Sequence, residues 1–492
     1  MKKQYIVSFD QGTTSSRCIV YNTQREEVSR GQLPFEQFFP NSGWVEHNPE
    51  EIWQTSLTSF EQACKTLGDV KGSIEAIGIT NQRETTVVWD RRNGKAVYPA
   101  IVWQDRRTLS FCYDLKSKGL EKGIREKTGL PIDPYFSASK VRWILNSSEE
   151  IRQRAEEGHL CFGTIDSWLI WKLTQGKSHI TDASNASRTM LFNLKNGSWD
   201  EELCKLFDIP MSMLPKVVDS SGDLAIAHPD VLGEAIPIRG ITGDQQAALY
   251  GHDAIEEGML KNTYGTGCFM LMNTGDKILD PSSGILATVA WRINGKITYA
   301  AEGSVFNAGS AMTWLEDVNL IQNVKETGKS AEKTPHNPLL IFVPAFTGLG
   351  APYWDSTARG LLIGLERNTS KEAIGRAVLE SIAYQNQDLL LAMKHASGLE
   401  PTALYVDGGM TANSFLMQFQ SDLCQIVIHL PSNQEQTALG AAKLAARPSN
   451  FFAESSEQNT SLFSPNASDY NEGYTQWKKA TQRAMHWTST QD

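Results

Sequence analysis

The stretch from Tyr5 to Tyr21 constrains the fold more than any other part of this chain. A β-branched and aromatic run, residues 5–9, ends in an acid, Asp10; a glycine turn rich in hydroxyl residues follows, then Arg17 and a second apolar run, residues 18–21. Two β-prone runs joined by a short glycine turn predict a β-hairpin. Its tip would present backbone N–H groups, hydroxyls and one cation to an anion, and the acid at the strand end could hold a hydrated Mg²⁺. We interpret the hairpin as a nucleoside triphosphate site; an ordinary polar turn is the alternative.

This predicted site is not a P-loop. That motif needs a glycine five residues before the glycine of Gly-Lys-Ser/Thr. The two Gly-Lys-Ser sequences of the chain, residues 176–178 and 328–330, have Trp171 and Asn323 at that position. We therefore expect both to be surface turns.

The composition excludes several classes of protein. A chain of 492 residues is too long for one core, so two or three domains are expected. The formal net charge of −10 disfavours nucleic-acid binding, which requires a basic face. The seven cysteines are dispersed, with no Cys-x-x-Cys pair, and the N-terminus lacks the pattern of a signal peptide. No apolar run approaches the length of a membrane span. We expect a cytoplasmic protein.

Helix and strand signals occur in both halves of the chain. Asn48 caps a predicted helix that ends at Gly68, and strands are predicted over residues 74–80 and 85–89, with a third strand, residues 97–103, returning after a turn at 93–94. In the second half, residues 369–372 have the pattern of a capping box at the start of a helix that closes at Gly398. A short strand, residues 404–407, follows, and Asn413 is the expected cap of the next helix.

Each half therefore contains a strand that ends in aspartate before a glycine turn, at Asp10 and at Asp407. This predicts two related α/β lobes. We place the domains at residues 1–252 and 253–448, followed by a polar tail, residues 449–492, with one late helix near 474–485.

Several long motifs, in a fixed order, identify a family resemblance. They are Asp10–Arg17, Gly43–His47, Gly78–Thr86, Asp133–Phe136, Asn185–Met190, Gly243–Leu249, Asn262–Asn273, Pro344–Asp355 and Phe415–Asp422. Up to about Ala446 the chain resembles the FGGY carbohydrate kinases of the sugar kinase/heat-shock/actin superfamily, and within them the members that phosphorylate glycerol. The resemblance implies an α/β fold with two actin-like (ribonuclease H-like) lobes, mixed β-sheets, flanking helices and an active site in the cleft between the lobes.

The implied reaction transfers the γ-phosphoryl group of ATP to a terminal hydroxyl of glycerol, giving sn-glycerol 3-phosphate and ADP. An alcohol does not ionise at pH 7, so its proton must leave as the O–P bond forms. The family's general base corresponds to Asp244. The alternative role for this residue is capping the helix that follows it.

The remaining site residues also follow from the resemblance. Glycerol would be bound by Arg83, Glu84, Tyr135, Asp244 and Gln245, against an apolar wall of Trp103 and Phe269. ATP would be bound by Thr13, Thr14, Ser15 and Arg17 at the phosphates, by Thr266 and Gly309 toward the ribose, and by Gly409 and Asn413 at the adenosine end, with Mg²⁺ oriented by Asp10 through water. Core packing is the alternative for the two aromatic residues, and a surface ion pair is the alternative for Arg83 and Glu84.

The chain departs from the family pattern at two places. Thr313, assigned with the nucleotide-binding residues, stands where the family commonly has glutamine, and its shorter side chain cannot make the same reach. The loop at residues 230–235 has an acid and no arginine, so we expect no inhibition by fructose 1,6-bisphosphate there. His228 lies about two residues out of register with the histidine that is phosphorylated in other members.

The family is often dimeric or tetrameric. Two alternatives stay open: an FGGY kinase for another polyol or a ketose, and an actin-like ATP-binding module without a metabolite substrate.

Overall fold

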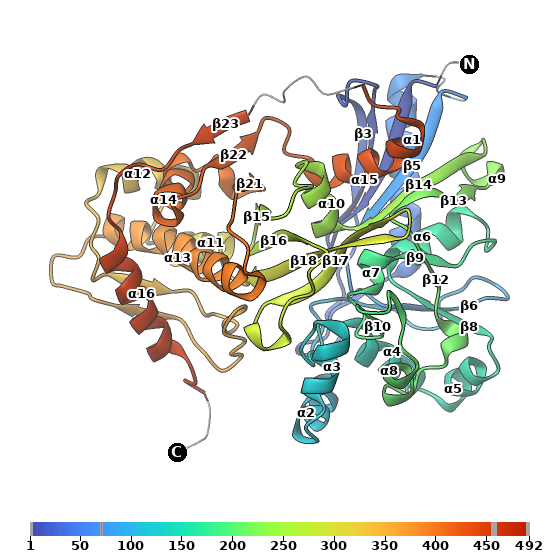
Figure 1. Ribbon diagram of the computed structural model, residues 1–492, viewed down its shortest axis with the longest axis horizontal. Coiled ribbons are helices and arrows are strands. Elements are labelled where there is room, and N and C mark those ends of the chain that lie inside the picture. Colours follow the sequence, from blue (N-terminus) through green and yellow to red (C-terminus); the bar gives the residue numbers. More distant parts are fainter. Residues whose placement is uncertain (1–2, 69, 71, 454–459, 489–492) are drawn as a thin grey trace. The chain divides into compact units, whose positions relative to one another are not determined.

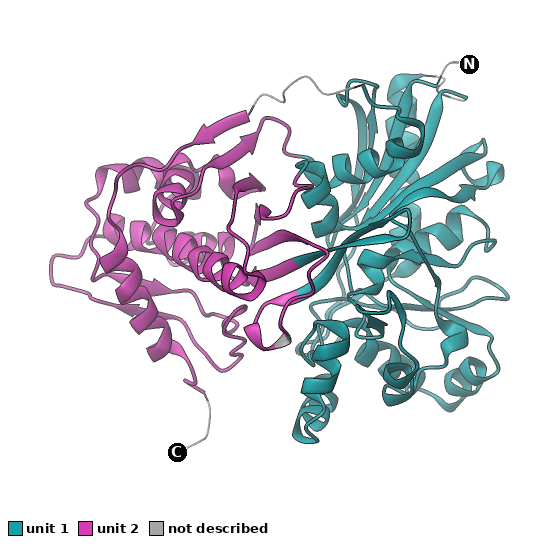
Figure 2. Ribbon diagram, viewed as in Figure 1, with its two compact units in different colours: residues 1–253, 287–300, 435–456 teal, residues 254–286, 301–434, 457–492 magenta. Residues whose placement is uncertain are grey.

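The computed structural model describes residues 3–68, 70, 72–453 and 460–488. It divides into two compact units, coloured separately in Figure 2. The first unit comprises residues 1–253, 287–300 and 435–456, and the second comprises 254–286, 301–434 and 457–492. The chain thus passes between the units after residues 253, 286, 300, 434 and 456. The units are discontinuous in sequence, because residues 287–300 and 435–456 belong to the first and residues 457–492 to the second. The division into domains 1–252 and 253–448 with a tail, 449–492, stays a prediction.

The main sheet of the first unit has the strand order β17-β13-β14-β5-β1-β2-β3. The predicted hairpin is β1 and β2, which pair antiparallel with Asp10 opposite Arg17. Strand β1 is parallel to β5, and β5 is parallel to β14. The bounds are Tyr5–Gln11 (β1), Ser15–Tyr21 (β2), Glu27–Pro34 (β3), Ile74–Asn81 (β5), Ser221–Ala227 (β13), Ile236–Gly243 (β14) and Leu286–Ile293 (β17).

Helices cover both faces of this sheet (Figure 1). On one face, α1 (Pro49–Leu67) and α6 (Ile165–Leu173) bury an apolar cluster in which the Phe9 and Phe60 rings stack 5.8 Å apart. On the other face, α15 (Gln436–Ala446) packs its alanines and Leu439 against Ile6 and Ile19. A sheet covered on both faces suits near-continuous apolar strands such as residues 74–79.

The contact between α15 and the sheet is close because two strand residues lack a side chain. A β-carbon placed on Gly78 would lie 2.3 Å from the carbonyl oxygen of Ala441, and one on Gly240 would lie 2.7 Å from the same oxygen. Any larger residue at either position would push the helix off the sheet. The backbone of α15 therefore rests directly on β5 and β14.

The rest of the first unit consists of short strand pairs and helices. The strand pairs are β4 (Glu46–His47) with β7 (Ala100–Ile101), β6 (Val87–Asp90) with β8 (Leu160–Gly163), β9 (Ile180–Asp182) with β12 (Lys216–Val218), and β10 (Phe192–Asn193) with β11 (Ser198–Trp199). The helices are α2 (Leu109–Ser117), α3 (Glu121–Thr128), α4 (Ser137–Leu145), α5 (Glu149–Glu156), α7 (Ala183–Ala186), α8 (Glu201–Leu206), α9 (Pro229–Leu232) and α10 (Asp244–Gly251).

The expected return strand, residues 97–103, is shorter in the structure. Only β7 is regular there, and β6 pairs with β8 instead. The returning segment still donates Val97 N to Val88 O, at 2.9 Å, and Ile101 N to Thr86 O, at 3.1 Å. Pro99 lies between these two bonds and has no N–H to donate, which explains the broken ladder.

The second unit repeats the strand arrangement of the first. Its sheet has the order β23-β22-β21-β15-β16-β18, with β15 antiparallel to β16 and parallel to β21, and β21 parallel to β22. Strand β15 therefore corresponds to β1, and β21 to β5. Asp407 ends β21, so its counterpart is Asn81 at the end of β5 rather than Asp10. The structure confirms that the two lobes are related. The correspondence of Asp10 with Asp407, from which that relation was predicted, is wrong.

The strands of the second unit are β15 (Met259–Tyr264), β16 (Cys268–Gly275), β18 (Lys296–Val305, along which the chain leaves the first unit), β19 (Ile341–Val343), β20 (Leu361–Ile363), β21 (Ala403–Asp407), β22 (Ile428–Pro431) and β23 (Thr460–Phe463). The helices are α11 (Gly309–Asp317), α12 (Thr327–Lys333), α13 (Lys371–Ser397), α14 (Ser414–Cys424) and α16 (Asn471–Ala484). Strand β23 pairs antiparallel with β22, so part of the predicted polar tail extends the sheet.

Helix α16 is attached to α13 through one buried carboxylate. Asp388 accepts hydrogen bonds from Tyr474 Oη at 2.5 Å, from Trp477 Nε1 at 2.6 Å and from Tyr353 Oη at 2.9 Å. Burial raises the pKa of Asp388, and its three donors oppose that shift. The late helix predicted near 474–485 is thus part of the folded second unit.

The capping signals are confirmed at three helices. Asn48 accepts from Glu50 N at the start of α1, and Asn413 accepts from Leu416 N at the start of α14. Helix α13 is capped by Ser370, one residue later than the capping-box pattern implied, and Gly398 ends it in the left-handed conformation. None of the helices within the described ranges combines the length and apolarity that crossing a bilayer demands.

Candidate active site

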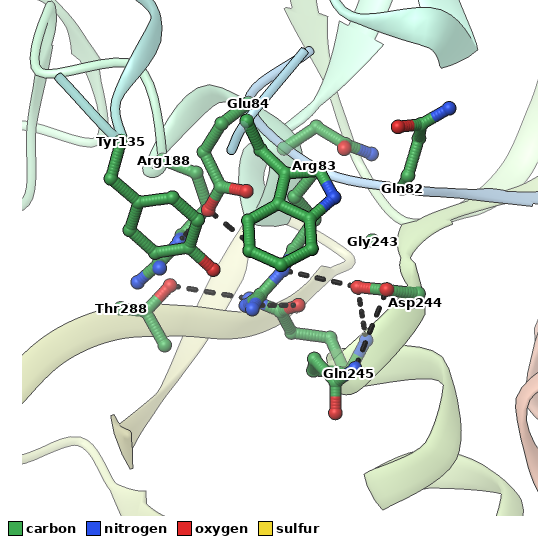
Figure 3. A network of polar contacts seen from close by, with 12 residues as sticks. Gln82, Arg83, Glu84, Tyr135, Arg188, Gly243, Asp244, Gln245 and Thr288 are labelled. Carbon is green, nitrogen blue, oxygen red and sulfur yellow. Dashed lines mark hydrogen bonds and ion pairs between the residues drawn. The ribbon is translucent and has the colours of Figure 1, made fainter. Parts of the chain in front are cut away.

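The polar site of the first unit lies where β5 and β14 end (Figure 3). Arg83 follows β5 by two residues, and Asp244 follows β14 directly as the first residue of α10. The Nε atom of Arg83 is 3.1 Å from Oδ1 of Asp244, and its Nη1 donates to Gln246 Oε1 at 3.2 Å. Parallel neighbouring strands bring these side chains together at one edge of the sheet.

Burial differs sharply between these charged groups. The side chain of Arg83 is 2% exposed and that of Asp244 is 31% exposed, so the carboxylate remains accessible while its partner is enclosed. The carboxylate also accepts from Gln245 N at 2.7 Å. Asp244 begins α10 but Gly243 occupies the cap position, so capping does not account for its side chain.

Glu84 is buried beside Arg83. Its side chain is 2% exposed, and Oε1 lies 2.6 Å from Nε of Arg188 and 3.9 Å from Nε of Arg83. A surface ion pair, the alternative for Arg83 and Glu84, is therefore excluded. Two guanidinium groups around one carboxylate favour its ionised form and leave it as an acceptor for hydroxyl donors.

Two aromatic residues stand next to this cluster. The rings of Trp103 and Tyr135 meet edge to face with centroids 5.6 Å apart, and both residues are half-buried. The indole Nε1 of Trp103 donates to the hydroxyl of Thr13 at 3.1 Å. Core packing is thus an incomplete description of Trp103, because it links the polar site to the tip of the hairpin.

The hairpin tip is held from two sides. Gly12 N donates to Ser15 O at 3.0 Å, and the Gln82 side chain donates to Gly12 O at 3.1 Å. Thr14 is exposed, whereas Thr13 and Ser15 are half-buried. The tip is consequently ordered and open to solvent at Thr14.

Arg17 on β2 is held by two carboxylates. It contacts Asp10 across the hairpin, and its Nη1 lies 2.5 Å from Oε2 of Glu435, the residue before α15. These acids outweigh its partial burial and raise its pKa, so Arg17 stays cationic. Within the described part of the chain, no group of three or more His, Cys, Asp or Glu side chains is arranged to hold a metal ion.

The other predicted site residues belong to the second unit. Thr266 follows β15, and its carbonyl oxygen accepts from the backbone N–H groups of Ala308 and Ser310 at 2.8 and 3.1 Å. A β-carbon on Gly309 would lie 2.6 Å from the carbonyl oxygen of Gly265, so only glycine fits there. These bonds place the start of α11 against the turn between β15 and β16.

The adenosine-end candidates are distributed around this turn. Thr313 is exposed on α11 and donates its hydroxyl to Gly309 O at 3.2 Å, and Gly409 is exposed in the turn after β21. Asn413 caps α14, and its side-chain amide contacts Thr327 Oγ1 at 3.4 Å. Phe269 on β16 is half-buried.

A cavity of about 680 Å³ lies beside α11, α12 and the start of α13 in the second unit. Thr327, the contact of Asn413, is part of its wall, but none of the predicted nucleotide residues lines it. In the segment 230–235, the residues up to Leu232 belong to α9, which His228 caps by accepting a hydrogen bond at Nδ1 from Asp230 N at 3.3 Å.

Three residues of the polar site were not predicted as site residues. Arg188, Gln246 and Glu435 each contact a predicted residue directly. Arg188 offered the clearest signal, because it is a lone charge before the apolar residues 190–192. Gln246 lies within the motif Gly243–Leu249, and Glu435 offered no signal of its own.

Comparison with known proteins accounts for both units. Residues 5–251 match the N-terminal domain, and residues 260–448 the C-terminal domain, of the FGGY family of carbohydrate kinases. Glycerol kinase 2 of Thermotoga maritima is 50% identical, covering 98% of this chain and 99% of that protein. Glycerol kinase of Carboxydothermus hydrogenoformans is 51% identical, with 99% of each chain covered.

Solved structures agree in fold. Plasmodium falciparum glycerol kinase with ADP superposes with a TM-score of 0.92 at 36% identity, covering 98% of this chain and 99% of that one. Gluconate kinase from Lactobacillus acidophilus, at 24% identity and a TM-score of 0.86, shares the fold. The expected mixed α/β fold is confirmed, and the chain belongs to the FGGY family of carbohydrate kinases.

Proposed function

We propose that this chain is an ATP-dependent kinase that phosphorylates a terminal hydroxyl of glycerol. Relatives named glycerol kinase at 50 and 51% identity over nearly the whole chain support the activity. One observation of the site supports it most directly: a partly exposed carboxylate, Asp244, is held 3.1 Å from a buried guanidinium, Arg83. A small polyol would find a base and hydrogen-bonding partners together there.

The roles of the pocket residues follow from their placement. Asp244 would accept the hydroxyl proton as the bond to phosphorus forms. Arg83 would hold Asp244 and donate to a substrate oxygen, Glu84 would accept from substrate hydroxyls, and Tyr135 and Gln245 would bind the remaining hydroxyl groups. Trp103, and Phe269 from the second unit, would contact the carbon chain. A triol has little apolar area, so its affinity must come from such paired polar contacts.

The proposed nucleotide contacts follow the family resemblance, residue by residue. Thr13, Thr14, Ser15 and Arg17 would contact the phosphates, and Thr266, Gly309, Thr313, Gly409 and Asn413 would contact the nucleoside portion. A relative solved with ADP supports ATP use. Asp10 is a single carboxylate at a strand end, which suits Mg²⁺ bound mainly through phosphate oxygens and water. The ion would neutralise phosphate charge during transfer.

We also propose a cytoplasmic homodimer or homotetramer. All seven cysteines are free, which suits a reducing compartment. Size-exclusion chromatography with light scattering would measure the oligomeric state, and a monomeric mass would contradict this part of the proposal.

A coupled ADP-release assay tests the function. We expect glycerol to stimulate ADP release far more than xylulose, gluconate or a tetritol. Glycerol without its middle hydroxyl, 1,3-propanediol, should be much poorer, because buried partners would be left unpaired. Preference for a ketose would identify another FGGY kinase, and ATP binding with no stimulation by any polyol or ketose would favour the actin-like module.

A further inference from the structure

The backbone of Glu84 has an unusual conformation. Its φ angle is +60°, in the left-handed region that residues with a β-carbon rarely adopt. Such a conformation persists only where the surroundings hold it, and it is frequent at ligand sites. The residues that hold Glu84 are therefore part of how the pocket is built.

The carbonyl oxygen of Glu84 is held by three side chains. It accepts from Ser137 Oγ at 3.0 Å, from Thr86 Oγ1 at 3.1 Å and from Lys140 Nζ at 3.3 Å. Ser137 and Lys140 both lie on α4 and, like Thr86, are fully buried. The peptide after Glu84 is thus fixed from the α4 side.

The carboxylate of Glu84 is held separately. Arg188, which follows α7, is fully buried and donates Nε–H to Oε1 at 2.6 Å (Figure 3). Arg188 and Lys140 therefore hold the two ends of the same residue, one by its side chain and the other by its backbone.

The same two cations also contact Tyr135. Lys140 Nζ donates to Tyr135 O at 2.5 Å, and the Arg188 guanidinium lies 5.5 Å from the centre of the Tyr135 ring, within cation–π range. Two buried cations that each meet both Glu84 and Tyr135 cannot move without moving the polar wall of the pocket.

We propose that Arg188 and Lys140 are positioning residues that set the affinity and selectivity for the polyol by fixing Glu84 and Tyr135. This inference rests on the proposed function, in which Glu84 and Tyr135 bind substrate hydroxyls. Neither cation needs to contact substrate. Their effect should appear in the KM for the polyol rather than in the KM for ATP.

The charge state of Lys140 gives an independent readout. Burial lowers its pKa to about 8, while the acidic groups near it, Glu84, Asp105 and Asp133, with the Cys112 thiol, oppose the shift. Below pH 8 the ammonium is charged and holds both carbonyl groups strongly. Above pH 8 it becomes neutral and holds them less well, so the KM for glycerol should rise with an apparent pKa near 8.

The experiment measures KM for glycerol, KM for ATP and kcat for wild type, Lys140→Met, Arg188→Lys and Glu84→Gln between pH 6.5 and 9. Lys443→Met is the matched control, because Lys443 is also buried, with its pKa lowered to about 8, but bonds to Gly251 at the end of α10 and to Asp253 rather than to Glu84 or Tyr135. Thermal melting with and without glycerol reports folding and binding without turnover.

We expect Lys140→Met and Arg188→Lys to raise the KM for glycerol by about tenfold or more, with the KM for ATP within about twofold of wild type. The alkaline rise in the KM for glycerol should be lost in Lys140→Met and kept in Lys443→Met. Both positioning variants should also lose preference for glycerol over 1,3-propanediol.

Two results would overturn the inference: an unchanged KM for glycerol in both variants while Glu84→Gln raises it, or an alkaline rise that persists in Lys140→Met. If neither variant folds, a wild-type KM for glycerol that is flat from pH 6.5 to 9 overturns it. If Glu84→Gln itself leaves glycerol binding unchanged, the assignment of the pocket has failed instead.

Discussion

Asp244 stands at the first position of α10, with a half-buried carboxylate beside a buried arginine. Replacing it with asparagine keeps the shape and removes the proton acceptor. We expect Asp244→Asn to lower kcat by about 10²-fold or more, with ATP binding retained. Initial rates and nucleotide titration would measure the two effects, and turnover close to wild type would remove Asp244 from the role of base.

Asp166, at the start of α6, predicts a pH dependence of stability. It is fully buried, and burial raises its pKa to about 6 although Thr164 and Thr181 donate hydrogen bonds to it. Because the folded pKa of Asp166 lies above its unfolded value, the contribution of Asp166 to stability is greatest below about pH 4 and is lost as the pH rises through 6. A shift of about two units corresponds to roughly 3 kcal/mol.

Asp166→Asn should remove the loss of stability that the ionisation of Asp166 causes as the pH rises. We expect its free energy of unfolding, relative to wild type, to rise between pH 4.5 and pH 7.5 by about 2 kcal/mol, because part of the effect is already present at pH 4.5. Urea unfolding at both pH values would measure it. The exposed Asp114→Asn serves as control, and a difference from wild type that stays constant with pH would contradict the assignment.

The family resemblance selected Arg83, Glu84 and Asp244 as site residues, and the interruption of an apolar strand pattern by charged residues placed Arg83 and Glu84 at a sheet end. They did not identify Lys140 or Glu435 as neighbours of the site. Whether a charge is buried, and against what, depends on which helices pack over the strand ends, and that information is spread over residues more than fifty positions apart.

The attachment of helix α16 depends on the carboxylate of Asp388. Asparagine at position 388 offers one acceptor where the carboxylate serves three donors. We expect Asp388→Asn to lower the free energy of unfolding by about 2 kcal/mol, because buried donors lose a charged acceptor. Chemical denaturation would measure the loss, and hydrogen exchange should become faster first in α16.

Tyr353→Phe is the matched control, since it removes one donor and leaves the carboxylate and the two contacts from α16. Its effect should be smaller than that of Asp388→Asn, with exchange in α16 unchanged. Equal effects of the two variants would contradict the anchoring of α16 by Asp388.

Among the elements, those with local signals were predicted well. Cap residues with apolar periodicity located α1 and α13, a cap residue alone located α14, and runs of β-prone residues located β1, β2, β5 and β21. The edge strand β23 and the pairing of β6 with β8 were not predicted, because a strand's partner is chosen by tertiary packing and short polar strands carry little pattern of their own.

On the scale of the whole molecule, the first unit is completed by a helix that comes late in the chain. Helix α15 covers Ile6, Ile19, Tyr21 and Ala76 on one face of the sheet. We expect the fragment 1–253 to lack a cooperative unfolding transition, and the same fragment linked to residues 434–453 to regain part of it. Near-ultraviolet circular dichroism with thermal melting would compare them; a cooperative transition in fragment 1–253 alone would contradict this.

The late position of α15 also affects how the protein is made. A ribosome must add about 190 residues after Asp253 before the whole helix is made, which takes roughly 10 to 40 s at ordinary rates of synthesis. Throughout that interval one apolar face of the nascent sheet has no cover. We therefore expect chaperones to bind the newly synthesised chain. The yield of folded protein in a cell should depend on the chaperone concentration more strongly than the stability of the folded protein would suggest.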